Sequence, residues 1–191
     1  MYSIILGSSS KYRRDLLQSL QQPFTQASPD IDETAKPNES SRDLSERLAI
    51  EKAEAIAKAN PDALVIGSDQ VAEIDGIPNG KSGDFATAFA QLRRASGKTC
   101  HFYTTVAVAK HGAPTRHVID VVEVVFRDLS DGEITRYLHA EEPYDCAGSF
   151  KSEGLGVSLF SAIRSEQPGS LIGLPMISTC QLLREFGVQI P

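Results

Sequence analysis

The sequence of 191 residues contains no tryptophan, only three cysteines and no long uninterrupted apolar run. The cysteines at positions 100, 146 and 180 are odd in number, widely spaced and form no CxxC motif. This pattern argues against a disulfide framework or a zinc site and indicates a reducing compartment, so we expect a cytoplasmic protein. The apolar runs are too short for a membrane span, and the N-terminus carries no secretory pattern.

Basic residues are in the minority, with 19 Lys and Arg against 25 Asp and Glu and a net charge of −6. Proteins that bind nucleic acids usually present a broad basic face, so we expect no nucleic-acid partner and no membrane partner. The sequence also lacks GxSxG, GxGxxG and HExxH motifs. These absences disfavour hydrolase triads and dinucleotide-dependent redox chemistry, but they leave room for a local phosphate-binding pocket.

Strand and helix periodicities alternate along the chain. Apolar, β-branched runs predict strands at 2–7, 24–27, 64–74, 101–109, 117–126 and 155–160. Apolar residues at helical spacing predict helices at 12–21, 40–59, 84–95, 130–140 and 175–186. The segment KHGAP at 110–114 predicts the turn of an antiparallel hairpin. The combination favours an α/β fold around a mixed sheet, in one domain over 1–191 with a cleft between two lobes.

The segment GSSSKYRRDLL at 7–17 joins the first predicted strand to the first helix. Its small residues offer hydroxyl and N–H groups at a helix N-terminus, where an anion is stabilised. One interpretation is a phosphate site formed by Ser8, Ser10 and Arg13. The alternative is a serine N-cap followed by solvated charges.

The apolar run ALVIG at 63–67 leads into Ser68, Asp69 and Gln70. Ligands bind outside the carboxyl ends of strands in open α/β sheets, so an acid there suggests chemistry. The alternative is that Asp69 satisfies loop amides. Lys52 lies within the apolar arc of the helix at 40–59. Its side chain either extends outwards to solvent or meets an acid or a phosphate in a polar cleft.

The tripeptide GKS at 80–82 resembles the end of a P-loop, but the glycine spacing is wrong. Position 75 is an aspartate, and Gly76 makes the loop one residue too short. Lys81 can still reach a phosphate as a point charge.

Six ordered segments resemble the Maf (septum formation protein) family: SSSKYRR at 8–14, DETA at 32–35, EKA at 51–53, GSDQV at 67–71, GK at 80–81 and AGSFKSEG at 147–154. The resemblance implies a cytoplasmic nucleoside triphosphate pyrophosphatase that cuts between the α and β phosphates with a divalent metal. It also implies a mixed sheet in two lobes with a deep central cleft, similar to inosine triphosphatases. Ser82 stands where most members have proline, which places the local turn in question.

The resemblance assigns the phosphate-binding groups. Ser8 and Arg13 look like members of a triphosphate cradle at the first helix, with the catalytic residues Lys52 and Lys81 closing on it. A nucleoside triphosphate brings about four negative charges, and attack by water requires these to be neutralised.

The acidic positions of the family match Glu33 and Asp69. Carboxylate oxygens suit Mg²⁺ or Mn²⁺, so both residues are expected to bind the metal, with Glu33 also a catalytic residue. Asp69 is the expected proton acceptor for the attacking water. Glu51 is either a further metal-side carboxylate or a solvated helix charge.

Three positions indicate the substrate within the family. Members acting on dTTP or UTP usually carry arginine, threonine and glutamine where this chain has Tyr12, Gln70 and Glu153. The residues here resemble those of the 7-methyl-GTP subtype. A methylated guanine is cationic, so stacking on Tyr12 gains a cation–π contribution, and Glu153 can accept the two guanine N–H groups.

Two alternatives stay open. One is a pyrophosphatase for dTTP, UTP or another modified nucleotide. The other is a non-catalytic, nucleotide-binding regulator of septum formation, although a pure binder requires no general base. A homodimer also remains open.

Overall fold

The computed structural model describes residues 2–191, and its helices and strands follow the predicted alternation. The elements in chain order are β1 (Ser3–Gly7), α1 (Lys11–Gln18), β2 (Phe24–Gln26), α2 (Ser41–Ala59), β3 (Ala63–Ile74), β4 (Ile77–Pro78), α3 (Phe85–Ala95), β5 (Thr99–Ala109), β6 (Arg116–Phe126), α4 (Asp131–Glu141), the 3-10 helix η1 (Leu155–Leu159), β7 (Phe160–Arg164) and α5 (Met176–Glu185).

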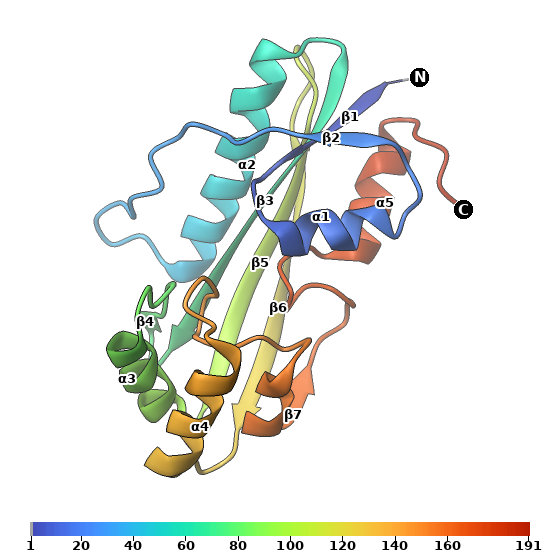
Figure 1. Ribbon diagram of the computed structural model, residues 1–191. Helices are drawn as coiled ribbons and strands as arrows, with labels where there is room; N and C mark the ends of the chain where they lie inside the picture. The colour runs from blue at the N-terminus through green and yellow to red at the C-terminus, as the bar shows by residue number, and fades with distance from the viewer. Residues whose placement is uncertain (1) are drawn as a thin grey trace. The chain divides into compact units, whose positions relative to one another are not determined.

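The strands form one mixed sheet with the order β2-β1-β3-β5-β6-β7, and β4 pairs with β3 (Figure 1). Strand β1 runs parallel to β2 and β3, whereas β4 is antiparallel to β3 and β7 is antiparallel to β6. Neighbouring strands β5 and β6 are joined by a turn at 110–115, which is too short to connect parallel strands, so the two strands run antiparallel. The predicted α/β fold around a mixed sheet is therefore confirmed.

A two-residue turn joins β3 to β4 and leads towards Lys81. Ile74 pairs with Ile77, and the turn residues Asp75 and Gly76 have φ values of 53° and 74°. Positive φ at both positions is the geometry of a type I′ hairpin, for which Asp-Gly is a favoured sequence. The chain thus reverses here, and GKS does not pass from a strand into a phosphate loop.

The strand predicted at 155–160 is wrong. Leu155–Leu159 forms the 3-10 helix η1, and the strand β7 follows at Phe160–Arg164. Gly156 and Leu159 are the buried residues of η1, and this spacing of three places both on one face of a 3-10 helix. A short apolar run fits either structure, and the burial of these two positions selects the helix.

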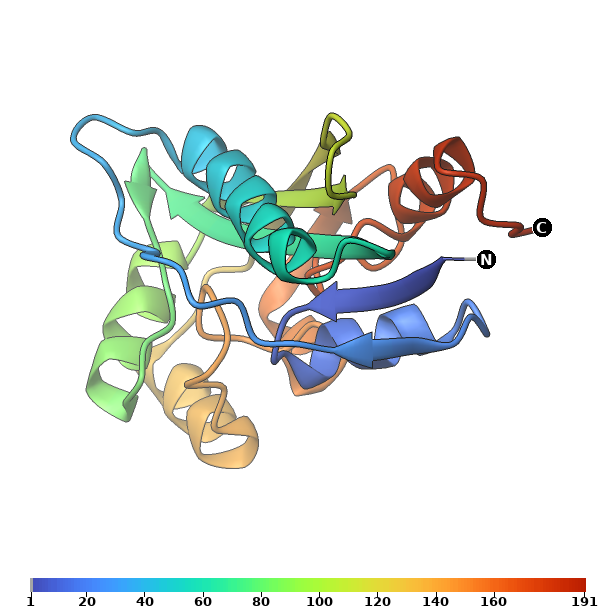
Figure 2. The same cartoon turned by 90° about the horizontal axis from the view of Figure 1, so that it is seen from above.

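The chain divides into two compact units that are interleaved in sequence. Unit 1 comprises 2–69, Thr104–Asp120 and Gln167–Pro191, and unit 2 comprises Gln70–Tyr103 and Val121–Glu166. In unit 1, helix α2 covers one face of the sheet and helices α1 and α5 cover the other (Figure 2). Alternate residues of β1 follow this division, because Ile5 packs with α2 whereas Ile4 and Leu6 pack with α1 and α5.

Unit 2 has an aromatic core. Phe102, Phe126, Phe150 and Phe160 meet edge to face with ring centroids between 4.7 and 5.7 Å apart. Edge-to-face contacts of this kind stabilise aromatic clusters beyond the burial of their area. Because Phe150 belongs to the AGSFKSEG segment, the cluster anchors that segment in the unit.

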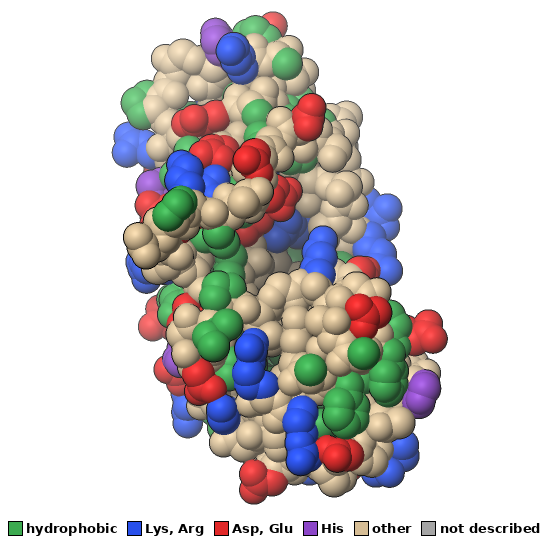
Figure 3. Space-filling model, turned by 90° about the vertical axis from the view of Figure 1, so that its left-hand side faces the viewer, with side chains coloured by type: hydrophobic (Ala, Val, Ile, Leu, Met, Phe, Trp, Pro, Cys, Tyr) green, Lys and Arg blue, Asp and Glu red, His purple; other side chains and the backbone are tan. Residues whose placement is uncertain are grey.

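Three features relate to the sequence-based expectations about membrane spans, disulfides and surface charge. Within residues 2–191, no helix combines the length and apolar character needed to cross a membrane. No disulfide joins the cysteines at 100, 146 and 180, all of which lie in the described part of the chain. On the face seen in Figure 3, acidic and basic side chains are interspersed over the surface.

Candidate active site

The register of two parallel strands brings polar residues together in unit 1. Leu6 pairs with Ile66 and Gly7 pairs with Gly67, so β1 ends where β3 reaches Ser68 and Asp69. Ser8 follows β1 directly and is buried. Ser8 therefore lies beyond the carboxyl end of β1, the kind of position where α/β proteins place their ligands, whereas Asp69 lies within β3, which continues to Ile74.

Two glycines allow helix α2 to lie unusually close to these strands. A Cβ atom on Gly67 would lie 2.7 Å from the Ala53 nitrogen and would also press on the Ala49 carbonyl oxygen. A Cβ on Gly7 would lie 3.1 Å from Ile56 Cδ1. Lys52 belongs to the turn of α2 that approaches Gly67, and this close approach brings its side chain to Asp69.

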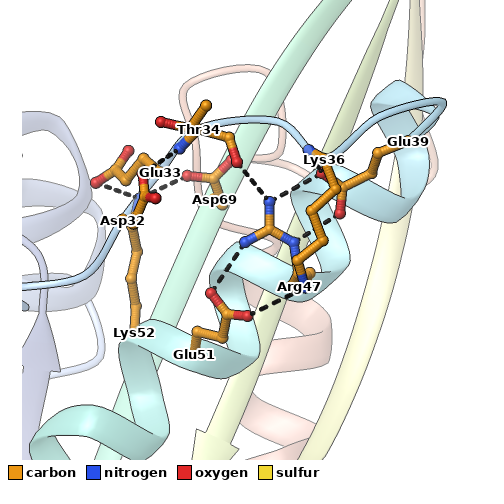
Figure 4. A network of polar contacts seen from close by, with 9 residues as sticks. All are labelled: Asp32, Glu33, Thr34, Lys36, Glu39, Arg47, Glu51, Lys52 and Asp69. Carbon is orange, nitrogen blue, oxygen red and sulfur yellow. Dashed lines mark hydrogen bonds and ion pairs between the residues drawn. The ribbon is translucent and has the colours of Figure 1, made fainter.

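Lys52 is buried and forms the centre of a charge cluster (Figure 4). Its Nζ lies 2.7 Å from Asp69 Oδ1 and 3.1 Å from Glu33 Oε1. Lys52 is 6% exposed and Asp69 is 7% exposed. Burial raises the pKa of Asp69, while the positive charges of Lys52 and Arg13 oppose that rise. Of the two interpretations of Lys52, the one in which it meets an acid is confirmed.

Buried hydroxyl groups fix the backbone around Asp69. Ser45 Oγ donates to the Asp69 carbonyl oxygen at 3.1 Å and lies 2.9 Å from Thr105 Oγ1. Ser68 Oγ lies 2.8 Å from the Thr105 carbonyl oxygen and 2.9 Å from that of Gly173. These contacts hold Asp69 in one position between α2 and β5. Sequence reasoning missed them.

Ser8, Ser10 and Arg13 bind one another at the start of α1, and Ser10 is an N-cap, as the alternative interpretation expected. Their convergence on a phosphate stays a prediction. Ser10 caps α1 by accepting the Arg13 N–H at 3.3 Å, and Ser8 Oγ accepts from the Ser10 N–H at 3.1 Å. Arg13 Nη1 lies 3.4 Å from Ser8 Oγ, and its Nε donates to the Gly173 carbonyl oxygen at 2.8 Å. Burial lowers the pKa of Arg13, and the charges of Asp69 and Glu33 counter this effect. By contrast, Arg14 is exposed and binds Asp15.

The two carboxylates on Lys52 suit a divalent cation. Glu33 and Asp69 come within 3.1 Å and 2.7 Å of one point, the Lys52 ammonium. Mg²⁺ is commonly held by one or two carboxylates together with substrate phosphates. Within residues 2–191, no three His, Cys, Asp or Glu side chains form a complete metal cage. A cation held by Glu33 and Asp69 would therefore need further ligands from water or from a phosphate.

In unit 2, Lys81 and Glu153 lie on two segments that pair with one another. Lys81 forms an antiparallel bridge with Ala147, and the Gly148 N–H donates to the Asn79 carbonyl oxygen at 3.0 Å. Both side chains are exposed. Ser152 Oγ donates to Glu153 Oε2 at 3.3 Å.

Gln91 of α3 contacts both of these segments, and sequence reasoning did not identify it. Its Nε2 donates to the Gly80 carbonyl oxygen at 3.1 Å, and its Oε1 accepts from the Ser149 hydroxyl. One amide therefore ties the segment that carries Lys81 to the segment that carries Glu153.

The other two predicted base-reading residues lie in different units. Tyr12 is half-buried on α1, with Lys11 Nζ 4.9 Å from the centroid of its ring. Gln70 is half-buried in β3, directly after Asp69. Unit 1 thus holds seven of the ten predicted residues, namely Ser8, Ser10, Tyr12, Arg13, Glu33, Lys52 and Asp69. Unit 2 holds Gln70, Lys81 and Glu153.

Comparison with known proteins gives a family match along almost the whole chain. Residues 3–186 match the family described as Maf-like protein. A 7-methyl-GTP pyrophosphatase of Xanthomonas axonopodis pv. citri is 52% identical over 193 residues, covering 100% of both chains. A 7-methyl-GTP pyrophosphatase of a Polaromonas species is 51% identical over 188 residues, covering 98% of this chain and 86% of the relative.

Solved structures with lower sequence identity share the fold. The Ham1 protein of Staphylococcus aureus superposes with a TM-score of 0.50 at 18% identity, covering 66% of this chain and 72% of that one. A dITP/XTP pyrophosphatase from Mycobacterium abscessus also gives a TM-score of 0.50, at 14% identity and with 97% and 98% coverage. The expected likeness to inosine-triphosphatase-like folds is therefore confirmed.

Proposed function

The chain belongs to the Maf family, and on this premise we propose that it hydrolyses 7-methyl-GTP to 7-methyl-GMP and pyrophosphate. Full-length relatives at 51% and 52% identity carry this activity in their names. The observation that carries the proposal is the buried Asp69, which is paired with Lys52, a lysine that also binds Glu33, and which lies close enough to Arg13 to feel its positive charge. A buried carboxylate among fixed cations suits attack by water on a phosphate better than simple binding does.

The residues at the start of α1 would bind the phosphates. Ser8, Ser10 and the N-terminal N–H groups of α1 offer donors. Arg13 adds a positive charge, and its hydrogen bond to the Gly173 carbonyl oxygen orients its guanidinium group. A helix N-terminus favours an anion at the same place. These groups orient the substrate before the reaction.

Asp69 is the proposed general base. It takes a proton from the attacking water, whose oxygen forms a bond to the α-phosphorus as the bond to the bridging oxygen breaks. Pyrophosphate leaves with that bridging oxygen. The burial that raises the pKa of Asp69 makes its carboxylate a better proton acceptor than an exposed aspartate.

The charges around Asp69 account for a requirement for a divalent metal. Arg13 and Lys52 are balanced by Glu33 and Asp69, so this cluster is close to neutral before substrate binds. A triphosphate adds about four negative charges. Glu33 and Asp69 would hold Mg²⁺ or Mn²⁺, which when bound supplies positive charge to the phosphates. Lys81 of unit 2 is the further cation that we assign to the phosphates.

The base-reading residues favour a methylated guanine. Tyr12 offers an aromatic face to a cationic base, and an arginine at this position would repel it. Glu153 has a carboxylate that accepts from both the N1–H and the 2-amino group of guanine. We assign Gln70 to the same base-reading set.

The proposed setting is the cytoplasm. The cysteines at 100, 146 and 180 form no disulfide in the described part of the chain, as a reducing compartment requires. The proposed partner is the nucleotide substrate, and the acidic net charge of −6 suits neither nucleic acids nor anionic membranes.

Pyrophosphate release from 7-methyl-GTP, GTP, dTTP and UTP tests the function, with and without EDTA. We expect the highest kcat/KM for 7-methyl-GTP and loss of activity with the chelator. A preference for dTTP or UTP would support the alternative substrate class. Tight binding without release from any nucleotide would support a regulatory protein instead.

A further inference from the structure

We propose that Arg47 is a positioning residue, which fixes the segment carrying Glu33 against helix α2 and thereby sets the affinity of the metal site. The inference rests on the proposed function, in which Glu33 binds the metal. Arg47 itself contacts neither Asp69 nor Lys52 through any of its four bonds described below.

Glu33 needs such support because of where it lies. It belongs to the stretch 27–40, which forms no helix or strand. Its side chain is 57% exposed, and it meets the buried Lys52 from this irregular segment. Ordering such a segment costs backbone entropy at every residue, so contacts elsewhere in the segment must hold it.

Arg47 supplies those contacts from the second turn of α2 (Figure 4). Its Nε and Nη2 donate to the two oxygens of Glu39 at 2.6 and 2.8 Å, and its Nη1 donates to Glu51 at 3.0 Å. Its Nη2 also donates to the carbonyl oxygen of Thr34 at 3.1 Å. Thr34 follows Glu33 in the chain, so this bond holds the backbone directly beside the metal ligand.

Two further hydrogen bonds within the segment order its backbone near Arg47. The Lys36 N–H donates to Glu39 Oε2 at 2.9 Å, and the Thr34 N–H donates to Asp32 Oδ1 at 2.9 Å. Side chains of Arg47 and Glu39 are only 15% and 9% exposed. Hydrogen bonds from Arg47 and Lys36 lower the pKa of Glu39 to about 2, so its negative charge persists at neutral pH.

Glu51 is a further partner of Arg47 and is not directed at Glu33 and Asp69, the carboxylates that we propose bind the metal. Its carboxylate binds Arg47, and Lys36 Nζ lies 4.0 Å away. The planar fork of arginine can satisfy two carboxylates and one carbonyl together, whereas a lysine ammonium lacks this geometry. The structure therefore gives Arg47 a role that lysine would fill only in part.

The test compares Arg47→Ala and Arg47→Lys with the wild-type full chain. Binding of Mn²⁺ alone is measured by electron paramagnetic resonance, and hydrogen exchange reports protection of residues 30–40. Loss of a group that orients a metal ligand typically weakens metal binding 10–100-fold. We expect about that loss for Arg47→Ala, a smaller loss for Arg47→Lys, and faster exchange in 30–40 for both.

The kinetic readout separates positioning from general damage. At saturating Mg²⁺, kcat for 7-methyl-GTP should stay within about threefold of wild type, because binding is weakened and the chemistry is unchanged. The matched control is Arg164→Ala, which breaks the exposed Arg164–Glu123 pair in unit 2 and should leave Mn²⁺ affinity unchanged. If Arg47→Ala does not fold, Glu39→Gln weakens the same arrangement while retaining Arg47.

Unchanged Mn²⁺ affinity and unchanged exchange in the Arg47 variants would overturn the proposal. A kcat that saturating Mg²⁺ fails to restore would overturn it as well, because the damage would then lie outside metal binding. Failure of the proposed function looks different: the wild type would hydrolyse none of the nucleotides, while the Arg47 effects on exchange and Mn²⁺ binding would persist.

Discussion

The two units hold their predicted functional residues by different means. In unit 1, Arg13, Lys52 and Asp69 are held by side-chain bonds within a buried cluster. In unit 2, Lys81 and Glu153 are exposed, and their segments are held by backbone pairing and by Gln91. Buried charges tolerate little change, because the removal of one partner leaves another unpaired. Exposed residues on paired segments can change without that penalty, which suits the base-reading role that we propose for Glu153.

The largest effect should come from the centre of the unit 1 cluster. Asp69→Asn keeps the size of the side chain but removes its ability to take a proton, so we expect kcat to fall by about 10²–10⁴-fold or more. Nucleotide binding, measured by calorimetry, should remain close to wild type. Near-normal turnover would mean that Asp69 has a structural role and that Glu33 is the next candidate for the base.

The second prediction separates neighbouring arginines and extends the comparison to unit 2. Arg13→Ala and Lys81→Ala should each lower kcat/KM by roughly 10²-fold, the scale of losing a preorganised contact to developing charge. Arg14→Ala serves as the control and should have little effect, because Arg14 is exposed and binds Asp15. Equal losses for Arg13 and Arg14 would exclude Arg13 as the phosphate-facing residue.

A smaller effect is expected from the amide that joins the two loops of unit 2. Gln91→Ala removes the bonds to Gly80 and Ser149, and we expect KM to rise about tenfold, the effect of losing one or two hydrogen bonds. The exposed Gln181, which contacts Glu185, provides the matched control as Gln181→Ala. If both variants behave like wild type, the loop positions do not depend on Gln91.

The smallest effect concerns stability and its dependence on pH. The pKa of Glu39 is about 2 in the folded protein, below its usual value of 4.5, because Arg47 donates to it. A lowered pKa stabilises the fold above the unfolded value, and this contribution is lost as the pH falls from about 4.5 towards 2.

Urea unfolding of wild type and Glu39→Gln should therefore differ at pH 7, with the difference shrinking below pH 4.5 and vanishing only as the pH approaches 2. A difference that stays constant over this range would mean that the charge of Glu39 does not contribute to stability.

Local patterns were sufficient to predict much of the fold and some of the site. Helical spacing placed Lys52 on the buried face of α2, and the glycine spacing before GKS argued against a P-loop. The strand predicted at 155–160 failed because a short apolar run fits a strand or a 3-10 helix equally well. Burial against the rest of unit 2 decides between them, and no local pattern encodes that burial.

Contacts between residues that are far apart in the sequence could not be predicted. The Gly173 carbonyl oxygen binds Arg13 across 160 positions, and a backbone carbonyl carries no residue-specific signal. Ser45 and Thr105 are ordinary residues of a helix and a strand until the fold brings them to Asp69. For Arg47, the spacing of four residues to Glu51 is typical of a helical ion pair, but it gives no reason to connect Arg47 to Glu33.

The central claim is that Tyr12, Gln70 and Glu153 select 7-methylguanine, and discrimination between nucleotide bases tests it most directly. The measurement is the ratio of kcat/KM for 7-methyl-GTP to that for dTTP, in wild type, in Glu153→Gln and in the triple variant with Tyr12→Arg and Gln70→Thr. A mismatched polar contact costs about 1–3 kcal/mol, so Glu153→Gln should lower the ratio by roughly 5- to 150-fold. The triple variant should lower it further, with hydrolysis of dTTP emerging. An unchanged ratio in all variants would contradict the account, because Tyr12, Gln70 and Glu153 would then not read the base.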